Sequence, residues 1–166
     1  MRKIILGVAV SLDGLIEGPN GEYDWCFTDQ DYGMEDFLKR IDAIFYGRKS
    51  FEVASNYIFP SKKRYIFSNT LAEVPEEATL VQGDGVEEAK KIMSQPGKDI
   101  WLFGGASLTT AFLHANLVDE IWLSIHPIIL GSGKPLFRGV QERKHFILRE
   151  TKTYNTGLVS VLYERK

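Results

Sequence analysis

The sequence has a single cysteine, Cys26, among its 166 residues. One thiol cannot form an internal disulfide or a cysteine-rich zinc site, and we expect a chain of this kind in the reducing cytoplasm. Basic residues are not in excess either, because the formal net charge is −2, which argues against a broad surface for nucleic acid. Long hydrophobic runs are also missing, since no segment approaches the roughly 18 consecutive apolar residues of a membrane span.

Histidine is scarce as well, with His114, His126 and His145 only. Their spacing matches no metal site, so we predict no metal and assign these side chains to structural or surface positions. A nucleophile elbow and the serine–histidine–aspartate arrangement of hydrolases are absent too.

What the chain does contain is a globular balance of residues in which strand-like runs alternate with helix-like runs. We predict strands over 3–10, 42–47, 63–68, 78–82, 99–105 and 118–130. We predict helices over 31–41, 48–56, 85–97 and 106–117. Residues 144–165 contain two β-rich runs about a turn at 155–157, which is typical of a terminal hairpin. This order predicts one α/β domain over 1–166, a three-layer α/β/α sandwich whose mixed, mostly parallel sheet ends in an antiparallel hairpin.

Ligands of such sheets bind beyond the carboxyl ends of the strands. At the end of the strand over 42–47, Gly47 leaves the backbone bare, Arg48 adds a cation and Ser50 adds a hydroxyl at the start of a helix. That combination suits a phosphate group. The alternative is a tight turn with a solvated arginine.

Two more strand ends have similar chemistry. Ser68 and Asn69 follow the strand over 63–68, where they can hold a phosphate or simply cap a turn. Gly104 and Gly105 precede Ser107, so the backbone there can lie against a flat or anionic group. The full glycine spacing of dinucleotide-binding proteins is absent. Three such ends in one small sheet nevertheless predict a phosphate-bearing ligand.

The remaining strand end and the loop after it are less specific. Asp13 and Gly14 are typical of a turn. The loop over 17–36 carries seven acidic residues and no lysine or arginine. Such a run is usually a solvated face. Because this loop also carries Trp25 and Phe27, we predict that these rings, with Asp13, contact a flat substrate.

The chain contains five notable stretches: AVSLDG (9–14), YGRKSFE (46–52), IFSNT (66–70), FGGASL (103–108) and VDEIWLSIHPIILGSGKPLF (118–137). In this order they resemble the dihydrofolate reductase superfamily. The similarity is greatest to the branch with the reductase (C-terminal) domain of the riboflavin-biosynthesis deaminase/reductase. The resemblance covers nearly the whole chain. It implies the sandwich fold described above, NADPH as the hydride donor, and a cis peptide bond between Gly104 and Gly105.

Carried over residue by residue, the resemblance implies a cofactor site in three parts. The adenosine and phosphate side would consist of Gly47, Arg48, Ser50, Phe67, Ser68 and Asn69. The pyrophosphate loop would consist of Gly104, Gly105, Ala106, Ser107 and Leu108. The nicotinamide would be flanked by Val8, Ala9 and Ile16. The basic and hydroxyl side chains of the first part favour NADPH over NADH.

The function implied is NADPH-dependent reduction of a small heterocyclic or carbonyl substrate, with hydride passing to the carbon of a C=N or C=O group. The specific candidate is 5-amino-6-(5-phosphoribosylamino)uracil of riboflavin biosynthesis, although its phosphate would meet the acidic loop unfavourably. A proton would come from water or from an acid. The candidates for that acid are Asp13 and, as substitutes, Glu35 and Asp36.

Two other hypotheses stay open. Dihydrofolate reductases place a carboxylate on the first helix to hold the pterin, and Asp31, Glu35 and Asp36 lie near that place without aligning securely. Dihydrofolate reduction is therefore the second hypothesis, and a nucleotide-binding protein without catalysis is the third. The terminal hairpin would leave an exposed strand edge, which invites pairing. Because related reductases pair through this part of the sheet, we expect a homodimer.

Overall fold

The computed structural model describes residues 1–54 and 59–166. Its helices are α1 (Met34–Arg40), α2 (Arg48–Ala54), α3 (Gly85–Ser94) and α4 (Ala106–His114). Its longer strands are β1 (Ile4–Val10), β3 (Ile41–Gly47), β4 (Lys63–Phe67), β5 (Ala78–Val81), β6 (Asp99–Gly104), β7 (Val118–Ile125), β9 (Phe146–Thr153) and β10 (Val159–Arg165). Two short strands, β2 (Leu15–Glu17) and β8 (Lys134–Pro135), pair with each other. Within the described ranges, no helix has the length and apolar character needed to cross a bilayer.

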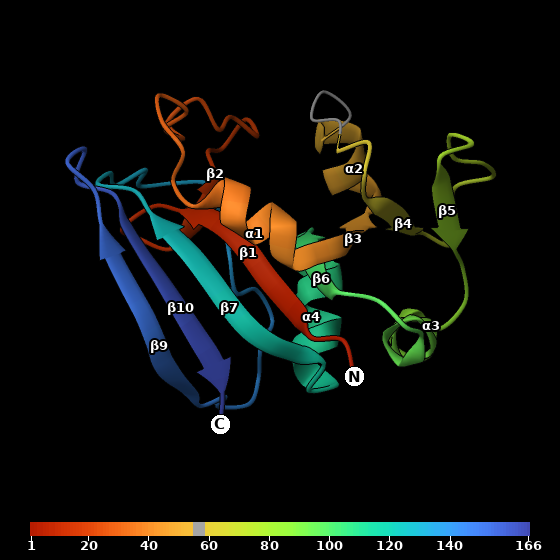
Figure 1. Ribbon diagram of the computed structural model, residues 1–166. Coiled ribbons are helices and arrows are strands. Elements are labelled where there is room, and N and C mark those ends of the chain that lie inside the picture. The colour runs from red at the N-terminus through yellow and green to blue at the C-terminus, as the bar shows by residue number, and fades with distance from the viewer. Residues whose placement is uncertain (55–58) are drawn as a thin grey trace.

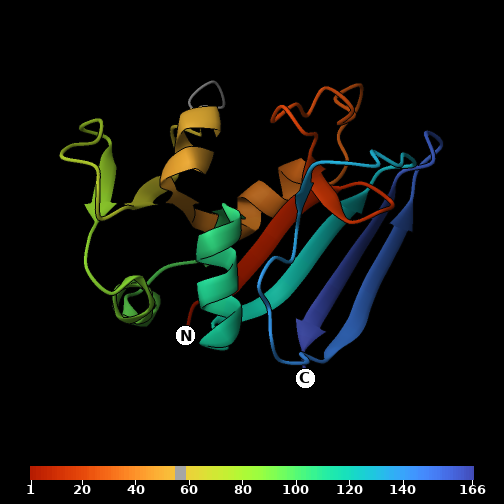
Figure 2. The ribbon, with the colours of Figure 1, turned by 180° about the vertical axis from the view of Figure 1, so that it is seen from behind.

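The eight long strands form one sheet in the order β5-β4-β3-β6-β1-β7-β10-β9 (Figure 1). The strands from β5 to β7 are parallel, and β10 and β9 continue the sheet as an antiparallel hairpin. Helices α1 and α2 cover one face, and α3 and α4 cover the other (Figures 1 and 2). The predicted α/β/α sandwich with a terminal hairpin is therefore confirmed.

The central strands are buried because their side chains are apolar on both faces. Ile4 and Leu6 of β1 point to the α3/α4 side, where they pack in one hydrophobic cluster with Phe112. Ile5 points the other way and packs in a second cluster with Phe37 and Trp101. A strand covered on both faces reads as a continuous apolar run rather than an alternating one, which is why β1 could be predicted from its composition.

Several predicted bounds were too long. The strand predicted over 118–130 ends at Ile125, just before His126 and Pro127. The helix predicted over 85–97 ends at Ser94, because proline at position 96 disfavours helical geometry for the residue before it. The helix predicted over 106–117 ends at His114, and the helix predicted over 31–41 is confined to Met34–Arg40. The helix predicted over 48–56 is described as far as Ala54, and 55–56 lie outside the described residues.

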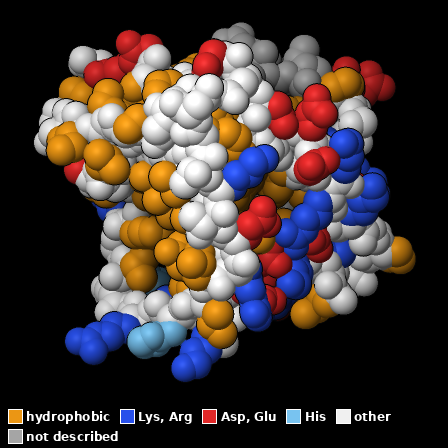
Figure 3. Space-filling view, turned by 60° about the vertical axis from the view of Figure 1, so that its left-hand side comes forward, with side chains coloured by type: hydrophobic (Ala, Val, Ile, Leu, Met, Phe, Trp, Pro, Cys, Tyr) orange, Lys and Arg blue, Asp and Glu red, His pale blue; other side chains and the backbone are white. Residues whose placement is uncertain are grey.

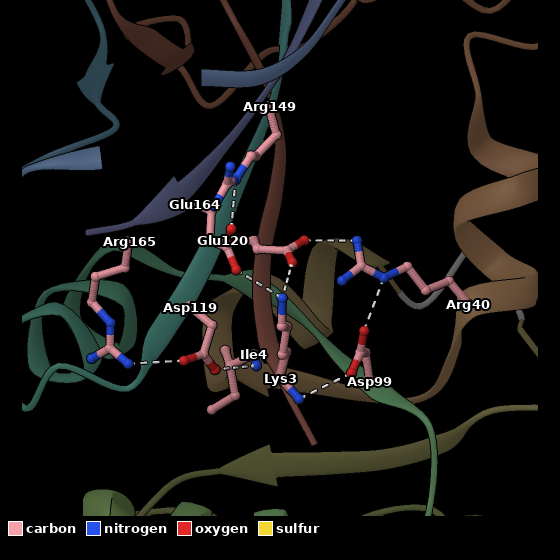
Figure 4. A network of polar contacts seen from close by, with 9 residues as sticks. All are labelled: Lys3, Ile4, Arg40, Asp99, Asp119, Glu120, Arg149, Glu164 and Arg165. Carbon is pink, nitrogen blue, oxygen red and sulfur yellow. Dashed lines mark hydrogen bonds and ion pairs between the residues drawn. The ribbon is translucent and has the colours of Figure 1, made fainter. Parts of the chain in front are cut away.

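A network of ion pairs ties the amino ends of the parallel strands together (Figure 4). Glu120 of β7 is its buried centre, with Lys3 Nζ at 2.8 Å and Arg40 Nη1 at 2.7 Å. Arg40 also reaches Asp99 at the start of β6, at 2.8 Å. Lys3 bonds Glu164 of β10 at 3.0 Å, so the network also reaches the antiparallel hairpin. The network does not extend to the carboxyl ends of the same strands, which lie at the opposite end of the sheet and can contact a ligand.

Candidate functional site

Three of the four predicted strand ends meet at one edge of the sheet. Strands β4, β3 and β6 are neighbours, and their register pairs Gly47 with Phe67 and Tyr46 with Gly104. Because parallel strands end at the same edge, the segments after β3, β4 and β6 lie side by side there. The fourth end belongs to β1, which is the next neighbour of β6.

A cavity of about 1000 Å³ opens at this edge. Nine of the residues predicted to hold a cofactor line it: Gly47, Arg48, Phe67, Ser68, Asn69, Gly105, Ala106, Ser107 and Leu108. Gly104, the last residue of β6, directly precedes Gly105 in the chain. Val8 and Ile16 pack partly buried against the cluster beneath the cavity, and Ala9 is half-buried on β1. The cavity therefore joins segments that are far apart in the sequence.

The backbones of β3 and β6 approach each other closely at their glycines. A Cβ added to Gly47 would lie 3.3 Å from the backbone nitrogen of Gly105, and one added to Gly105 would lie 3.2 Å from Ser50 Oγ. Gly104 has φ +115°, a conformation that side chains disfavour. The peptide bond between Gly104 and Gly105 is cis, as the resemblance implies. Ser50 thus touches the glycine turn from α2, and the backbone there stays bare toward the cavity.

The lining of the cavity is strongly basic. Arg48, Lys49, Lys134 and Arg138 contribute cations. Among the described residues that line the cavity, Asp84 is the one with a carboxylate. This carboxylate caps the amino end of α3, where it accepts the backbone N–H groups of Val86 and Glu87. Its negative charge is therefore turned toward the helix. An anionic ligand, and a phosphate in particular, suits such a surface.

The turn after β4 is organised by its own polar side chains. Ser68 Oγ accepts the backbone N–H of Thr70 at 3.2 Å and of Leu71 at 3.1 Å. Asn69 bonds both backbone groups of Gly83, at 2.7 Å and 3.3 Å. Arg48 reaches this turn through Thr70 Oγ1 at 3.2 Å. The capping role considered as an alternative is present, and it places these residues on the wall of the cavity.

The three candidate acids are arranged unfavourably for donating a proton. Asp13 accepts hydrogen bonds from Ser11 Oγ and from the backbone of Gly131 and Leu130, at 2.6, 2.8 and 3.1 Å. These bonds, with that from Ser11 foremost, lower the pKa of Asp13 to about 2, so its carboxylate is ionised at neutral pH. Glu35 and Asp36 are exposed on α1, and Asp36 pairs with Lys39 at 3.0 Å.

Trp25 and Phe27 have a partner inside the protein. Their rings lie edge-on to the ring of His126, with centroids at 5.3 Å and 5.0 Å. His126 is buried, its Nε2 accepts the backbone N–H of Phe27 at 3.0 Å, and its Nδ1 lies 2.9 Å from the carbonyl of Ser124. The ring is thus neutral, with its proton on Nδ1, and desolvation lowers its pKa. His126 therefore has the structural position expected for it, anchoring the acidic loop.

Sequence reasoning missed one wall of the cavity. Lys134, Arg138 and Gly139 line it from the segment between β7 and β9, whose local pattern indicates no particular role. Lys134 also pairs with Glu17 of the acidic loop at 3.0 Å. The available signal was the pair of glycines at 131 and 133, both with positive φ. A Cβ at Gly133 would lie 2.0 Å from the carbonyl oxygen of Glu17, so the two segments are pressed together there.

Comparisons with known proteins agree with this architecture. The family model "RibD C-terminal domain" matches residues 2–160. The uncharacterized protein YyaP of Bacillus subtilis is 48% identical, over 98% of this chain and 94% of its own length. A Caenorhabditis elegans protein named "Putative dihydrofolate reductase" is 30% identical, over 75% of this chain and 71% of its own. The crystal structure of a "Putative riboflavin biosynthesis protein" from Shewanella sp. PV-4 matches with TM-score 0.87 at 29% identity, covering 100% of this chain and 99% of that one.

Proposed function

The chain belongs to the RibD C-terminal domain family, and on that premise we propose that it is an NADPH-dependent reductase of a small heterocyclic or carbonyl substrate. One observation carries the proposal: the bare ends of β3 and β6 and the polar turn after β4 share one basic cavity of about 1000 Å³. A cavity of this volume is at the upper end of the range for small-molecule and cofactor sites. When bound, the nicotinamide cofactor supplies the hydride.

The residues of the cavity fit a dinucleotide phosphate. Gly47 and Gly105 leave a cradle that a single Cβ would narrow, so the backbone can approach a ligand closely. We assign the pyrophosphate to the turn over 104–108 and the adenosine to the surface between Arg48 and Asn69. Val8, Ala9 and Ile16 are assigned to the nicotinamide side, next to β1.

The charge of the adenosine side favours NADPH over NADH. Arg48 and Lys49 lie together at the start of α2, and Ser68 faces the same cavity. NADPH differs from NADH by a 2′-phosphate, which such cations stabilise and which NADH lacks. The ion pair of Arg48 with Glu52 at 3.0 Å partly neutralises its charge. The preference for NADPH therefore depends on Arg48 and Lys49 together.

For the substrate, we propose 5-amino-6-(5-phosphoribosylamino)uracil. The similar Shewanella protein, whose name refers to riboflavin biosynthesis, supports this choice. The ion pair between Lys134 and Glu17 supports it too, because a lysine from a distant segment offsets part of the acidic loop. Dihydrofolate is disfavoured, since Glu35 and Asp36 of α1 are exposed and cannot hold a pterin in a closed site.

We assign the proton of the reduction to solvent water. Asp13 is ionised, and its oxygens are occupied by Ser11, Leu130 and Gly131. The protein's own contribution is then mainly to hold the cofactor and the substrate in reactive contact.

Cofactor titration tests the proposal directly. The purified chain should bind NADPH with a lower Kd than NADH, measured by quenching of intrinsic tryptophan fluorescence. Oxidation of bound NADPH should then be followed in absorbance with the uracil substrate and, separately, with dihydrofolate. Absence of binding to either cofactor would remove the proposal. Binding without turnover on any pterin, pyrimidine or aldehyde would support a nucleotide-binding protein instead.

We further propose that the protein is a homodimer formed through the terminal hairpin. Strand β9 is the edge of the sheet, and it exposes Ile147 and Leu148 at 41% and 51% of their surface. Figure 3, which turns this edge forward, shows hydrophobic side chains gathered on that side of the molecule. An exposed strand edge is a template for pairing with a second chain, and the two apolar side chains would be buried on pairing.

A further inference from the structure

The segment between β7 and β9 forms a wall of the cavity beside α4. Lys134, Arg138 and Gly139 line the cavity from this segment. Figure 2 shows the segment running along the side of α4 that faces away from α3. Arg48 and Lys49 approach from the other direction, at the end of β3. The cavity therefore has cations from two unrelated parts of the chain.

The position of Arg138 is set by its backbone. Thr110 Oγ1 donates to the Arg138 carbonyl at 2.6 Å, which places this residue beside the second turn of α4. A little earlier in the segment, Leu136 is buried and donates its backbone N–H to Gly14 at 2.9 Å. Thr110 lies four residues beyond Ala106, or about 6 Å along the helix axis, a length that an arginine side chain spans. The guanidinium of Arg138 can therefore reach the turn that begins α4.

The basic side chains that line the cavity differ in whether an acidic side chain pairs with them. Lys134 is paired with Glu17, and Arg48 is paired with Glu52. Arg138 is exposed, and in the part of the chain that the structure describes no carboxylate lies within ion-pairing distance of it. A free guanidinium on a cavity wall is the donor that binds a phosphate in two-point fashion.

We infer that Arg138 binds the pyrophosphate of the dinucleotide, an inference that rests on the proposed function. Arg48 and Lys49, at the end of β3, are assigned to the 2′-phosphate. The cavity thus has one cationic position for the pyrophosphate of NADPH and a separate one for its 2′-phosphate. The side chain of Arg138 contributes to both NADPH and NADH, because both contain the pyrophosphate. It is a binding residue and not a determinant of the preference between them.

The test compares Arg138→Gln with Arg143→Gln, a matched control. Arg143 is an exposed arginine of the same segment and does not line the cavity. We expect Arg138→Gln to raise the Kd of NADPH and of NADH by the same factor, about tenfold. Displacement of NADPH by adenosine 2′-monophosphate, which has no pyrophosphate, should give an unchanged Kd for that ligand. Arg138→Lys should retain part of the affinity, and Arg143→Gln all of it.

Each other outcome has a distinct meaning. An unchanged Kd for NADPH in Arg138→Gln overturns the inference while the proposed function stands. A loss confined to NADPH, or an equal loss for adenosine 2′-monophosphate, also overturns it, because the guanidinium would then hold the 2′-phosphate. If the unaltered chain binds neither NADPH nor NADH, the proposed function falls and the inference falls with it.

Discussion

Asp13 Oδ2 accepts the backbone N–H of Gly131 at 2.8 Å, across 118 positions of the chain. The bond joins the loop after β1 to the segment that carries Lys134 and Arg138 into the cavity. The pairing of β2 with β8 and the ion pair between Lys134 and Glu17 continue the same contact. Asp13 therefore fixes a wall of the site through another segment, which makes it a positioning residue.

Replacing Asp13 with Asn should loosen this contact. Leu130 donates to Oδ1 and Gly131 donates to Oδ2 of the carboxylate, and an amide replaces one of these oxygens with an NH₂ donor, so one of the two bonds is lost. Hydrogen exchange of the Leu130 and Gly131 amides should become faster, while Asp24→Asn, on an exposed carboxylate of the neighbouring loop, leaves it unchanged. If Asp13→Asn leaves the exchange of these two amides unchanged, the positioning role of Asp13 is refuted.

Gly47→Ala should weaken cofactor binding as well as lower stability. The new Cβ would sit 3.3 Å from the Gly105 backbone nitrogen, so the glycine turn must shift by a few tenths of an ångström. We expect the Kd of NADPH to rise several-fold at a stability cost of about 1 kcal/mol. Gly21→Ala is the control, because its φ of +80° makes an added Cβ costly through the backbone alone, at a residue outside the cavity lining. Equal Kd values for the two variants would contradict the close-approach argument.

Glu120→Gln should destabilise the protein at neutral pH. Burial opposes ionisation of Glu120, but the ion pairs with Arg40 and Lys3 outweigh it and lower its pKa. The ionised carboxylate therefore contributes its full stability above the pKa that Glu120 has in the unfolded chain. This contribution is lost as the pH falls through the lower pKa that Glu120 has in the folded protein. We expect a loss of about 2 kcal/mol in urea unfolding, because Lys3 and Arg40 stay partly solvated. Asp36→Asn, which removes an exposed pair, should change stability by well under 1 kcal/mol.

His126 should make stability fall under mild acid. Burial lowers its pKa below the ordinary value of 6.5, so the unfolded chain takes up a proton before the folded one does. The neutral ring of His126 therefore makes its full contribution to the free energy of unfolding above about pH 6.5. This contribution declines as the pH drops below that value. His126→Gln should flatten this slope in urea titrations between about pH 5 and 7. His145→Gln, at an exposed histidine, should leave the slope as it is.

Leu148→Lys should convert the proposed dimer to a monomer. A lysine in place of this exposed leucine would lose an apolar contact and have to bury a charge on pairing, which opposes dimer formation. Sedimentation at micromolar concentration should show the unaltered chain as a dimer and the variant as a monomer. Lys152→Glu reverses a charge on the same strand without removing an apolar contact and should stay dimeric. A monomeric unaltered chain would refute the proposal.

Much of this arrangement could be predicted from local patterns. The apolar run of β1 and the strand-to-glycine junctions at Gly47 and Gly104 depend on neighbouring residues alone, and they predicted the parallel sheet and the strand ends at which the cavity lies. Element ends were less predictable, because they depend on details such as the proline at position 96. The contacts of Asp13 and Trp25 could not be predicted at all, since their partners Gly131 and His126 are about 100 positions away or more.

The amino-acid sequence by itself determined the class of fold, the order of its elements and the bare strand ends that line the cavity. Those features follow from side-chain periodicity and from the lack of a Cβ in glycine, which act within a few residues. Tertiary structure alone decided that Arg138 joins the cavity wall, that His126 holds Trp25 and Phe27, and that Leu130 and Gly131 donate to Asp13. Each of these depends on which distant segment supplies a hydrogen bond, a ring or a charge, and folding brings those segments together.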